Sequence, residues 1–193
     1  MAYAKKTLAN LQQSLADRHD SGVLPTSSVT LAYWTRLLNR GLAYCADKLK
    51  LETSDTITIA SGTGALPDDF ISINRVFSGD QEYTQISKDD VENQTGYTYW
   101  ITGSHFGGFY LNTETDGDYT VYYAYRPAEM VNTTDVCVIP DPEAVSAFAY
   151  GMLRKSETDP IEDADASLQE CEDRLNSLIM AQNINDKLEG FHI

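Results

Sequence analysis

Basic side chains are scarce in this sequence. Its 193 residues include 14 Lys and Arg against 29 Asp and Glu, which gives a formal net charge of −15. Binding along a nucleic acid is driven by Lys and Arg side chains that displace counterions from the phosphates. The charge balance therefore excludes a surface that wraps DNA or RNA, and it favours solubility.

Cysteines and long apolar runs are also few. The three cysteines are far apart and lack C-x-x-C spacing, which indicates neither a disulfide framework nor a zinc site. The sequence contains no run of about 18 apolar residues that could cross a membrane. Its N-terminus lacks the apolar core of a signal peptide. We therefore expect a protein of a reducing cytoplasm without a membrane-spanning segment.

Motifs of catalysis are missing. The chain contains no phosphate loop, dinucleotide fingerprint, G-x-S-x-G turn or H-E-x-x-H pair. Its three histidines, His19, His105 and His192, have no nucleophile or metal ligand beside them in the sequence. The acidic pairs at 68–69 and 89–90 lack EF-hand spacing and are typical of solvated turns. We expect no enzymatic activity, no cofactor and no metal site.

Apolar residues at helical spacing mark the start of the chain. A first helix is predicted by Leu8, Leu11 and Leu15, and the turn-forming Gly22 follows it. A longer helix spans 31–49, where Gly41 weakens it by about 1 kcal/mol relative to Ala.

The helical pattern returns after residue 140. Asp141 can cap this helix, and Pro142 fits its first position. Its many Ala and Gly residues allow a neighbouring helix or subunit to come close, and packing inside the chain is the simpler interpretation. In the last helix, apolar residues step by three and four over 161–178, which predicts that it packs on an earlier helix.

Carboxylates are concentrated at the start of this last helix. Residues 157–173 contain eight of them and no base, more than helix capping requires. Residues 186–193 lack periodicity, and we expect a flexible tail there.

Between the helical ends the apolar period changes to two. Stretches such as TITIA, YTYWI and DYTVYYAYR predict strands, and eight of the twelve tyrosines fall between Tyr83 and Tyr125. These aromatic side chains suit core packing or contact with another protein. We predict an α+β fold in which residues 1–55 and 140–185 form a helical bundle and residues 56–139 form an inserted antiparallel β domain.

Three stretches carry a resemblance to a known family. ALPDDFISINRV, YTVYYAYRPAEMVNTTD and VIPDPEAVSAFAYGMLRK follow one another as in the head-to-tail connector proteins of tailed bacteriophages, also called adaptor or head-completion proteins. The chain is similar to this family over nearly its whole length, because the family also has N-terminal helices, a β insertion and C-terminal helices.

The resemblance implies a ring, typically a dodecamer, bound beneath the portal of the capsid. Double-stranded DNA would pass through the ring without specific binding, since an acidic channel wall repels phosphates. The implied partners are the portal protein, a tail, nozzle or stopper protein, and further copies of the chain. The implied place is the neck of the virion, after assembly in the host cytoplasm.

Charge and the resemblance together point to two sets of contact residues. Residues 1–50 carry +4, which leaves −19 for the remainder, so basic and acidic helix faces can meet across a subunit interface. The candidates for this interface are Arg36, Arg40, Glu162, Asp163 and Asp165. For docking to the portal, the apolar and terminal residues of the tail are candidates: Leu188, Phe191, His192 and Ile193.

Two other functions remain open from the sequence. One is an acidic protein that imitates DNA and inhibits host nucleases. The other is a tail component that binds carbohydrate through its aromatic β segment.

Overall fold

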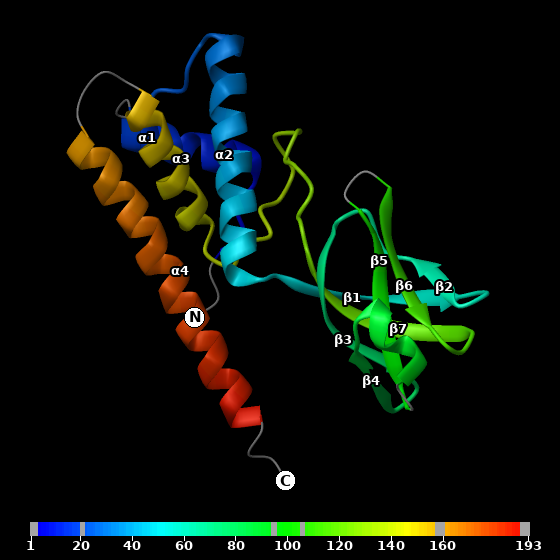
Figure 1. The fold of residues 1–193 in the computed structure, drawn as a ribbon. Helices are drawn as coiled ribbons and strands as arrows, with labels where there is room; N and C mark the ends of the chain where they lie inside the picture. Colours follow the sequence, from blue (N-terminus) through cyan, green and yellow to red (C-terminus); the bar gives the residue numbers. More distant parts are fainter. Residues whose placement is uncertain (1–3, 20–21, 94–95, 105–106, 157–160, 190–193) are drawn as a thin grey trace. The chain divides into compact units, whose positions relative to one another are not determined.

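The computed structural model describes residues 4–19, 22–93, 96–104, 107–156 and 161–189, without the side chains of 92–93, 161–162 and 183–189. The fold is α+β, and the chain divides into two compact units (Figure 1). The helical unit comprises Met1–Leu49 and Pro127–Ile193, and the β unit comprises Lys50–Arg126.

The described part of the helical unit contains four α-helices: α1 (Leu8–His19), α2 (Ser28–Leu49), α3 (Pro142–Ser156) and α4 (Ile161–Glu189). Helix α3 contacts each of the other three (Figure 1). It can do so because its small residues Ala144, Ala147, Ala149 and Gly151 are all buried and let neighbouring backbones approach. The small side of α3 is thus used for packing within the chain, as the simpler interpretation predicted.

Helix α4 packs on α3 through the apolar positions that the spacing predicted. Ala164, Cys171 and Leu175 are at most 1% exposed. The helix runs on to Glu189, so residues 186–189, where the predicted tail begins, have helical backbone. Their sequence, DKLE, contains no helix-breaking residue, and the first glycine comes only at position 190.

The β unit consists of seven strands and a short 3-10 helix, η1: β1 (Glu52–Ile59), β2 (Thr63–Ala65), β3 (Phe70–Ser78), β4 (Gln81–Gln85), η1 (Lys88–Asn93), β5 (Thr98–Ser104), β6 (Gly108–Thr113) and β7 (Gly117–Tyr125). They form one sheet in the order β1-β7-β3-β4-β5-β6-β2. The two end strands meet at the bridge between Ala60 and Thr63, so the sheet nearly closes on itself.

The sheet is mixed, although an antiparallel sheet was predicted. Strands β4 and β5 are parallel, with Thr84 opposite Thr98. The connection through η1 returns the chain to the starting end of β4, which is what a parallel pair requires. Strand β2 was not predicted, because its surroundings, SGTG, have the composition of a turn.

Aromatic side chains fill the core of the β unit. Tyr99, Tyr119 and Tyr123 are at most 4% exposed and pack with aliphatic residues from β1, β3 and β6. The hydroxyl of Tyr119 donates to the carbonyl of Thr115 at 2.9 Å, so this buried polar group is satisfied. Core packing therefore accounts for these three tyrosines.

The segment after β7 associates with the helices. The sequence-based division placed residues 127–139 in the β domain. In the structure, the amide of Leu8 donates to the carbonyl of Asp135 at 2.8 Å, and the amide of Cys137 donates to Lys6 at 2.9 Å. Such pairing between distant residues is invisible to local sequence patterns.

Candidate assembly surfaces

A network of ion pairs joins α1 and α4. Arg18 donates to both carboxylate oxygens of Glu170, at 2.8 and 2.9 Å. Glu170 also accepts from Nε of Arg174, one turn further along α4, at 2.9 Å. The paired geometry holds the guanidinium of Arg18 in one orientation.

The same network reaches the start of α3. Arg174 donates to Oδ2 of Asp141 at 2.9 Å, and Oδ1 of Asp141 accepts from the amide of Glu143 at 3.1 Å. Asp141 is thus the predicted N-cap of α3 and also the anchor of Arg174, with its side chain 2% exposed. Glu143 in turn pairs with Lys6 and lies 3.6 Å from Arg18.

The network sets the protonation of its carboxylates. The hydrogen bonds from Arg18 and Arg174 outweigh burial and lower the pKa of Glu170 to about 2. For Glu143, burial opposes ionisation, but the hydrogen bond and charge of Lys6, together with the charges of Arg18 and Arg174, lower the pKa. Both groups are therefore ionised near neutral pH.

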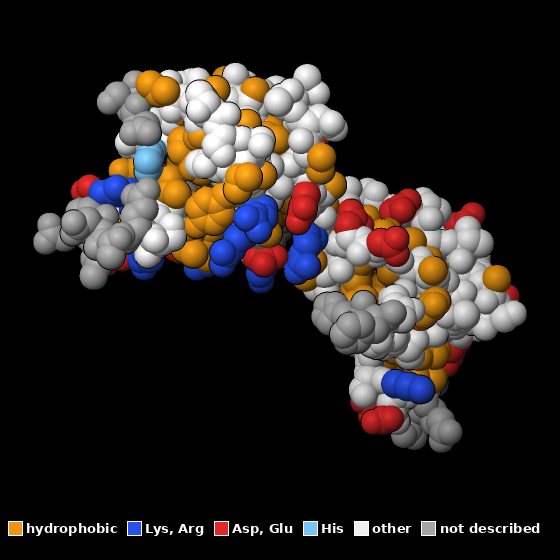
Figure 2. Space-filling model, turned by 90° about the horizontal axis from the view of Figure 1, so that it is seen from above, with side chains coloured by type: hydrophobic (Ala, Val, Ile, Leu, Met, Phe, Trp, Pro, Cys, Tyr) orange, Lys and Arg blue, Asp and Glu red, His pale blue; other side chains and the backbone are white. Residues whose placement is uncertain are grey.

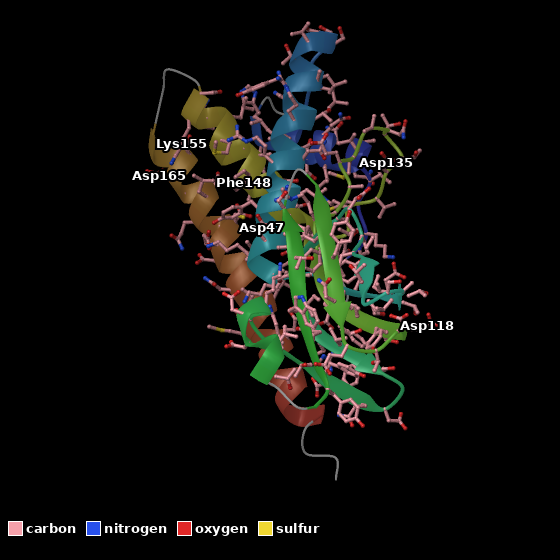
Figure 3. All side chains as sticks on the ribbon, turned by 45° about the vertical axis from the view of Figure 1, so that its right-hand side comes forward. Asp47, Asp118, Asp135, Phe148, Lys155 and Asp165 are labelled. Carbon is pink, nitrogen blue, oxygen red and sulfur yellow. The ribbon has the colours of Figure 1, made fainter. Side chains whose placement is uncertain are left out.

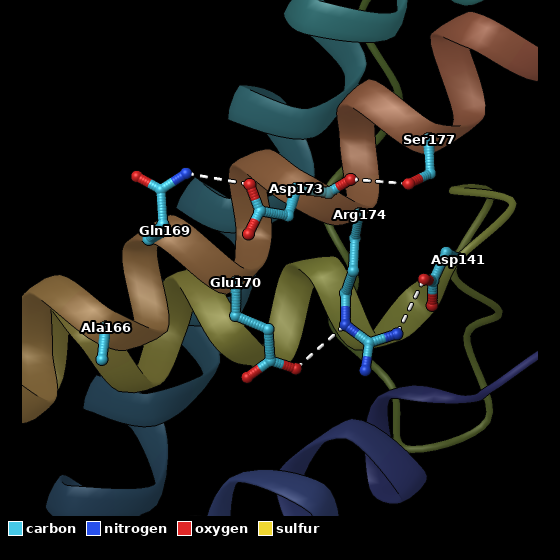
Figure 4. A pocket seen from close by; sticks show the side chains of 7 residues that line it. All are labelled: Asp141, Ala166, Gln169, Glu170, Asp173, Arg174 and Ser177. Atoms are coloured by element: carbon cyan, nitrogen blue, oxygen red, sulfur yellow. Dashed lines mark hydrogen bonds and ion pairs between the residues drawn. The ribbon is translucent and has the colours of Figure 1, made fainter.

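An open hollow of about 570 Å³ lies over this network (Figure 4). Its lining comes from α4 and the cap of α3: Asp141, Ala166, Gln169, Glu170, Asp173, Arg174 and Ser177. The one cation, Arg174, already donates to two carboxylates (Figure 4). The cation of the lining is therefore already paired, and the carboxylate of Asp173 accepts a hydrogen bond from the amide of Gln169 at 2.9 Å.

The predicted interface arginines lie on the surface of α2. Arg36 and Arg40 are one helical turn apart and both are exposed. The guanidinium of Arg36 lies over the ring of Tyr33, 5.7 Å from its centroid. In the part of the chain that the structure describes, neither arginine pairs with Asp163 or Asp165.

The predicted interface carboxylates already have partners in their own chain. Asp163 lies 3.9 Å from Arg154, and Asp165 lies 3.1 Å from Lys155, between the end of α3 and the start of α4 (Figure 3). Their side chains remain 64% and 60% exposed, so a second cation can still approach them. The side chain of Glu162 lies outside the described residues.

The predicted docking residues are largely outside the described part of the chain. Position 188 belongs to α4, but nothing is described of the Leu188 side chain, and Phe191, His192 and Ile193 lie beyond the described residues. Of the histidines, His19 is the last residue of α1, and its ring lies 5.7 Å from that of Trp34. His105 and His192 are not described.

Charge is distributed differently in the two units. In the β unit four bases, Lys50, Arg75, Lys88 and Arg126, stand against a majority of acids. On the face shown in Figure 2, basic and acidic side chains lie side by side on the helical unit, whereas acidic ones predominate on the β unit. The surface of the β unit therefore repels polyanions more uniformly.

The described residues provide neither a cluster of metal ligands nor a membrane-spanning helix. They contain no group of three or more His, Cys, Asp or Glu side chains that could hold a metal ion. No helix among them is long and apolar enough to cross a membrane.

The chain is similar to a known protein family over most of its length. The sequence model of one family, described as SU10 adaptor protein, matches residues 6–188. No curated protein matches the chain. The family match covers both units and all four helices, including α4 almost to its end.

Proposed function

Because the chain belongs to the SU10 adaptor protein family, whose members are structural adaptors of bacteriophages, we propose that it forms a ring between the capsid portal and the tail. The observation that carries this proposal is the extent of the match, residues 6–188 of 193. The ring is a dodecamer in the neck of the virion. In each copy of the chain, the four helices act as one bundle, and the β unit is an insertion in that bundle.

The charge of the chain supports a channel for DNA. A net charge of −15 per copy, multiplied around a ring, gives a wall that repels phosphates. Double-stranded DNA then passes without binding, because the acidic wall does not displace the counterions of the DNA phosphates. The portal protein lies on one side of the ring, and a tail, nozzle or stopper protein lies on the other.

Lateral contacts form between basic and acidic helix faces of neighbouring copies. Arg36 and Arg40 of one copy face Asp163, Asp165 and Glu162 of the next. Because Asp163 and Asp165 already have Arg154 and Lys155 beside them, the arginines join a cluster of mixed charge. Exposed pairs of this kind are weakened by salt.

The two alternative functions fit less well. An inhibitor that imitates DNA needs an array of unpaired carboxylates, but Glu170 and Glu172 of α4 are paired with Arg18 and Lys48. A carbohydrate site needs exposed aromatic rings. Tyr97 and Tyr110 are exposed, but Tyr99, Tyr119 and Tyr123 are core residues, so only part of the tyrosine-rich segment could serve such a site.

The test is the mass of the assembly. Native mass spectrometry of the full chain, alone and with purified portal protein, is expected to show a ring. The variant with Arg36→Glu and Arg40→Glu should dissociate at lower salt than the unaltered ring, and reversal of Asp163 and Asp165 to Arg in the same chain should restore it. Lys5→Glu, an exposed charge reversal outside these faces, is the control. A chain that stays monomeric under all these conditions contradicts the ring.

A further inference from the structure

The helical unit exposes a group of aliphatic side chains beyond the C-terminal end of α1. We call this group the tip. It consists of residues from the α1–α2 connection and the first turn of α2: Val23, Leu24 and Val29, which are 64%, 41% and 77% exposed. A single exposed aliphatic residue is common on protein surfaces, but three from one short stretch suggest a surface that another protein covers.

A second group lies at the opposite end of α1. We call it the valine strip, and it consists of Val131, Val136 and Val138, which are 75%, 47% and 47% exposed. It belongs to the segment that is hydrogen-bonded to the residues at the start of α1. Helix α1 has 12 residues and is about 18 Å long. The strip is bonded to the residues at its start, whereas the tip follows its last turn, where the amide of Gly22 donates to the carbonyl of Ala16.

The valine strip has a free backbone edge. Val136 and Val138 are exposed, whereas Cys137 between them and Ile139 after them are buried. Such alternation is typical of a strand. The amide of Cys137 donates to Lys6, so one edge is paired. The backbone groups of Val136 and Val138 point to the other edge, where the described residues provide no hydrogen-bond partner.

The tip has matching backbone groups. Val23 and Leu24 belong to no helix or strand, and within the described part of the chain their backbone groups form no hydrogen bond. Pro25 follows and restricts Leu24 to an extended conformation. An extended aliphatic segment with free backbone groups is what adds to the edge of a strand.

We propose that the tip of one copy docks on the valine strip of the next copy, with Val23 and Leu24 adding as a short strand along Val136 and Val138. This contact rests on the proposed ring. A second copy of the chain is the occupant, because both groups are present in every copy and each has exposed aliphatic side chains beside backbone groups that can pair with those of the other. The contact joins different surfaces of the two copies, and a head-to-tail contact of this kind forms a ring when the rotation from copy to copy closes.

The proposed contact can be tested with variants that each break one half of it. A tip variant, Val23→Asp with Leu24→Asp, and a strip variant, Val136→Asp with Val138→Asp, change exposed residues only and should keep their circular dichroism. Each variant alone is expected to lose ring assembly. Their equimolar mixture is expected to form a dimer and nothing larger, because one intact tip then meets one intact strip. A mixture that stays monomeric, or a variant that still forms the ring alone, contradicts the contact.

Cross-linking gives an independent result. The three native cysteines are buried, so introduced surface thiols can be oxidised selectively. The double variant Leu24→Cys and Val136→Cys should yield covalent multimers, whereas each single variant should stay a monomer on a non-reducing gel. Rings that assemble normally without this cross-link contradict the contact and leave the proposed function intact. An unaltered chain that forms no ring, even with portal protein, contradicts both.

Discussion

Gly151 of α3 faces Leu168 of α4 with no room for a side chain between them. A Cβ at Gly151 would come within 2.7 Å of Cγ of Leu168 and 3.0 Å of the carbonyl of Ala164. We expect Gly151→Ala to lower the free energy of unfolding by about 1 to 2 kcal/mol, because overpacking costs about 1–3 kcal/mol and the gain in helix propensity offsets up to about 1 kcal/mol. Urea unfolding, followed by the helical circular dichroism signal, measures this.

Two further variants locate the cause of this loss. In a Leu168→Ala background, Gly151→Ala should cost less, since the atoms nearest to the new methyl group are gone. Gly107→Ala is the control, because a Cβ there would meet nothing closer than the hydroxyl of Ser104 at 3.7 Å. Equal costs at Gly151 in both backgrounds would show that Leu168 is not the obstacle.

Asp141 combines two stabilising contacts in one buried carboxylate. Asp141→Ala removes the cap of α3 and leaves Arg174 with Glu170 as its remaining partner in the network. We expect a loss of about 2–4 kcal/mol, less than for a fully buried pair because the Arg174 side chain is 34% exposed. Asp141→Asn keeps a capping oxygen and should lose about half as much. The same urea experiment measures both, and equal losses would mean that the capping oxygen of Asp141 is unimportant.

Glu170 should make the helical unit sensitive to acid. Its pKa is lowered from about 4.5 in the unfolded chain to about 2, so its stabilising contribution is complete above about pH 4.5 and is lost as pH falls toward 2. Glu170→Gln should flatten the dependence of the unfolding midpoint on pH in this window. Arg18→Gln removes the main cause of the lowered pKa and should move the loss to higher pH. If the Arg18→Gln profile merely shifts down at every pH, the assignment to Glu170 is wrong.

Local patterns in the sequence predicted the helices well. Asp141 and Pro142 mark the start of α3, because a cap and a first-turn proline act on neighbouring residues. The spacing of Ala164, Cys171 and Leu175 predicted the buried face of α4 for the same reason. Gly41 was expected only to weaken α2, but a Cβ there would lie 2.9 Å from the carbonyl of Val145, so the glycine permits the close packing of α3.

Features that depend on distant residues were not predictable. Arg18 and Glu170 are 152 positions apart, and nothing near either residue indicates the other. The carboxylates of α4 looked like an unpaired excess, yet Asp163, Asp165 and Glu170 each have a cation from the same chain beside them. The parallel pairing of β4 and β5 depends on the path of the chain through η1, which alternation within a strand cannot reveal.

Docking to the portal can be tested by removing the residues that follow α4, because the helix itself then stays intact. Because α4 continues to Glu189, truncation after that residue removes Phe191, His192 and Ile193 without shortening the helix. We propose that the two apolar side chains of this terminus anchor the ring to the portal, so the truncated protein should assemble and unfold normally but fail to bind portal-bearing capsids. Leu188→Asp should weaken the same binding, and Gln182→Asp, an exposed change in the same helix, should not. Co-sedimentation with capsids measures the binding, and full retention of the truncated ring on capsids would exclude the terminus as the anchor.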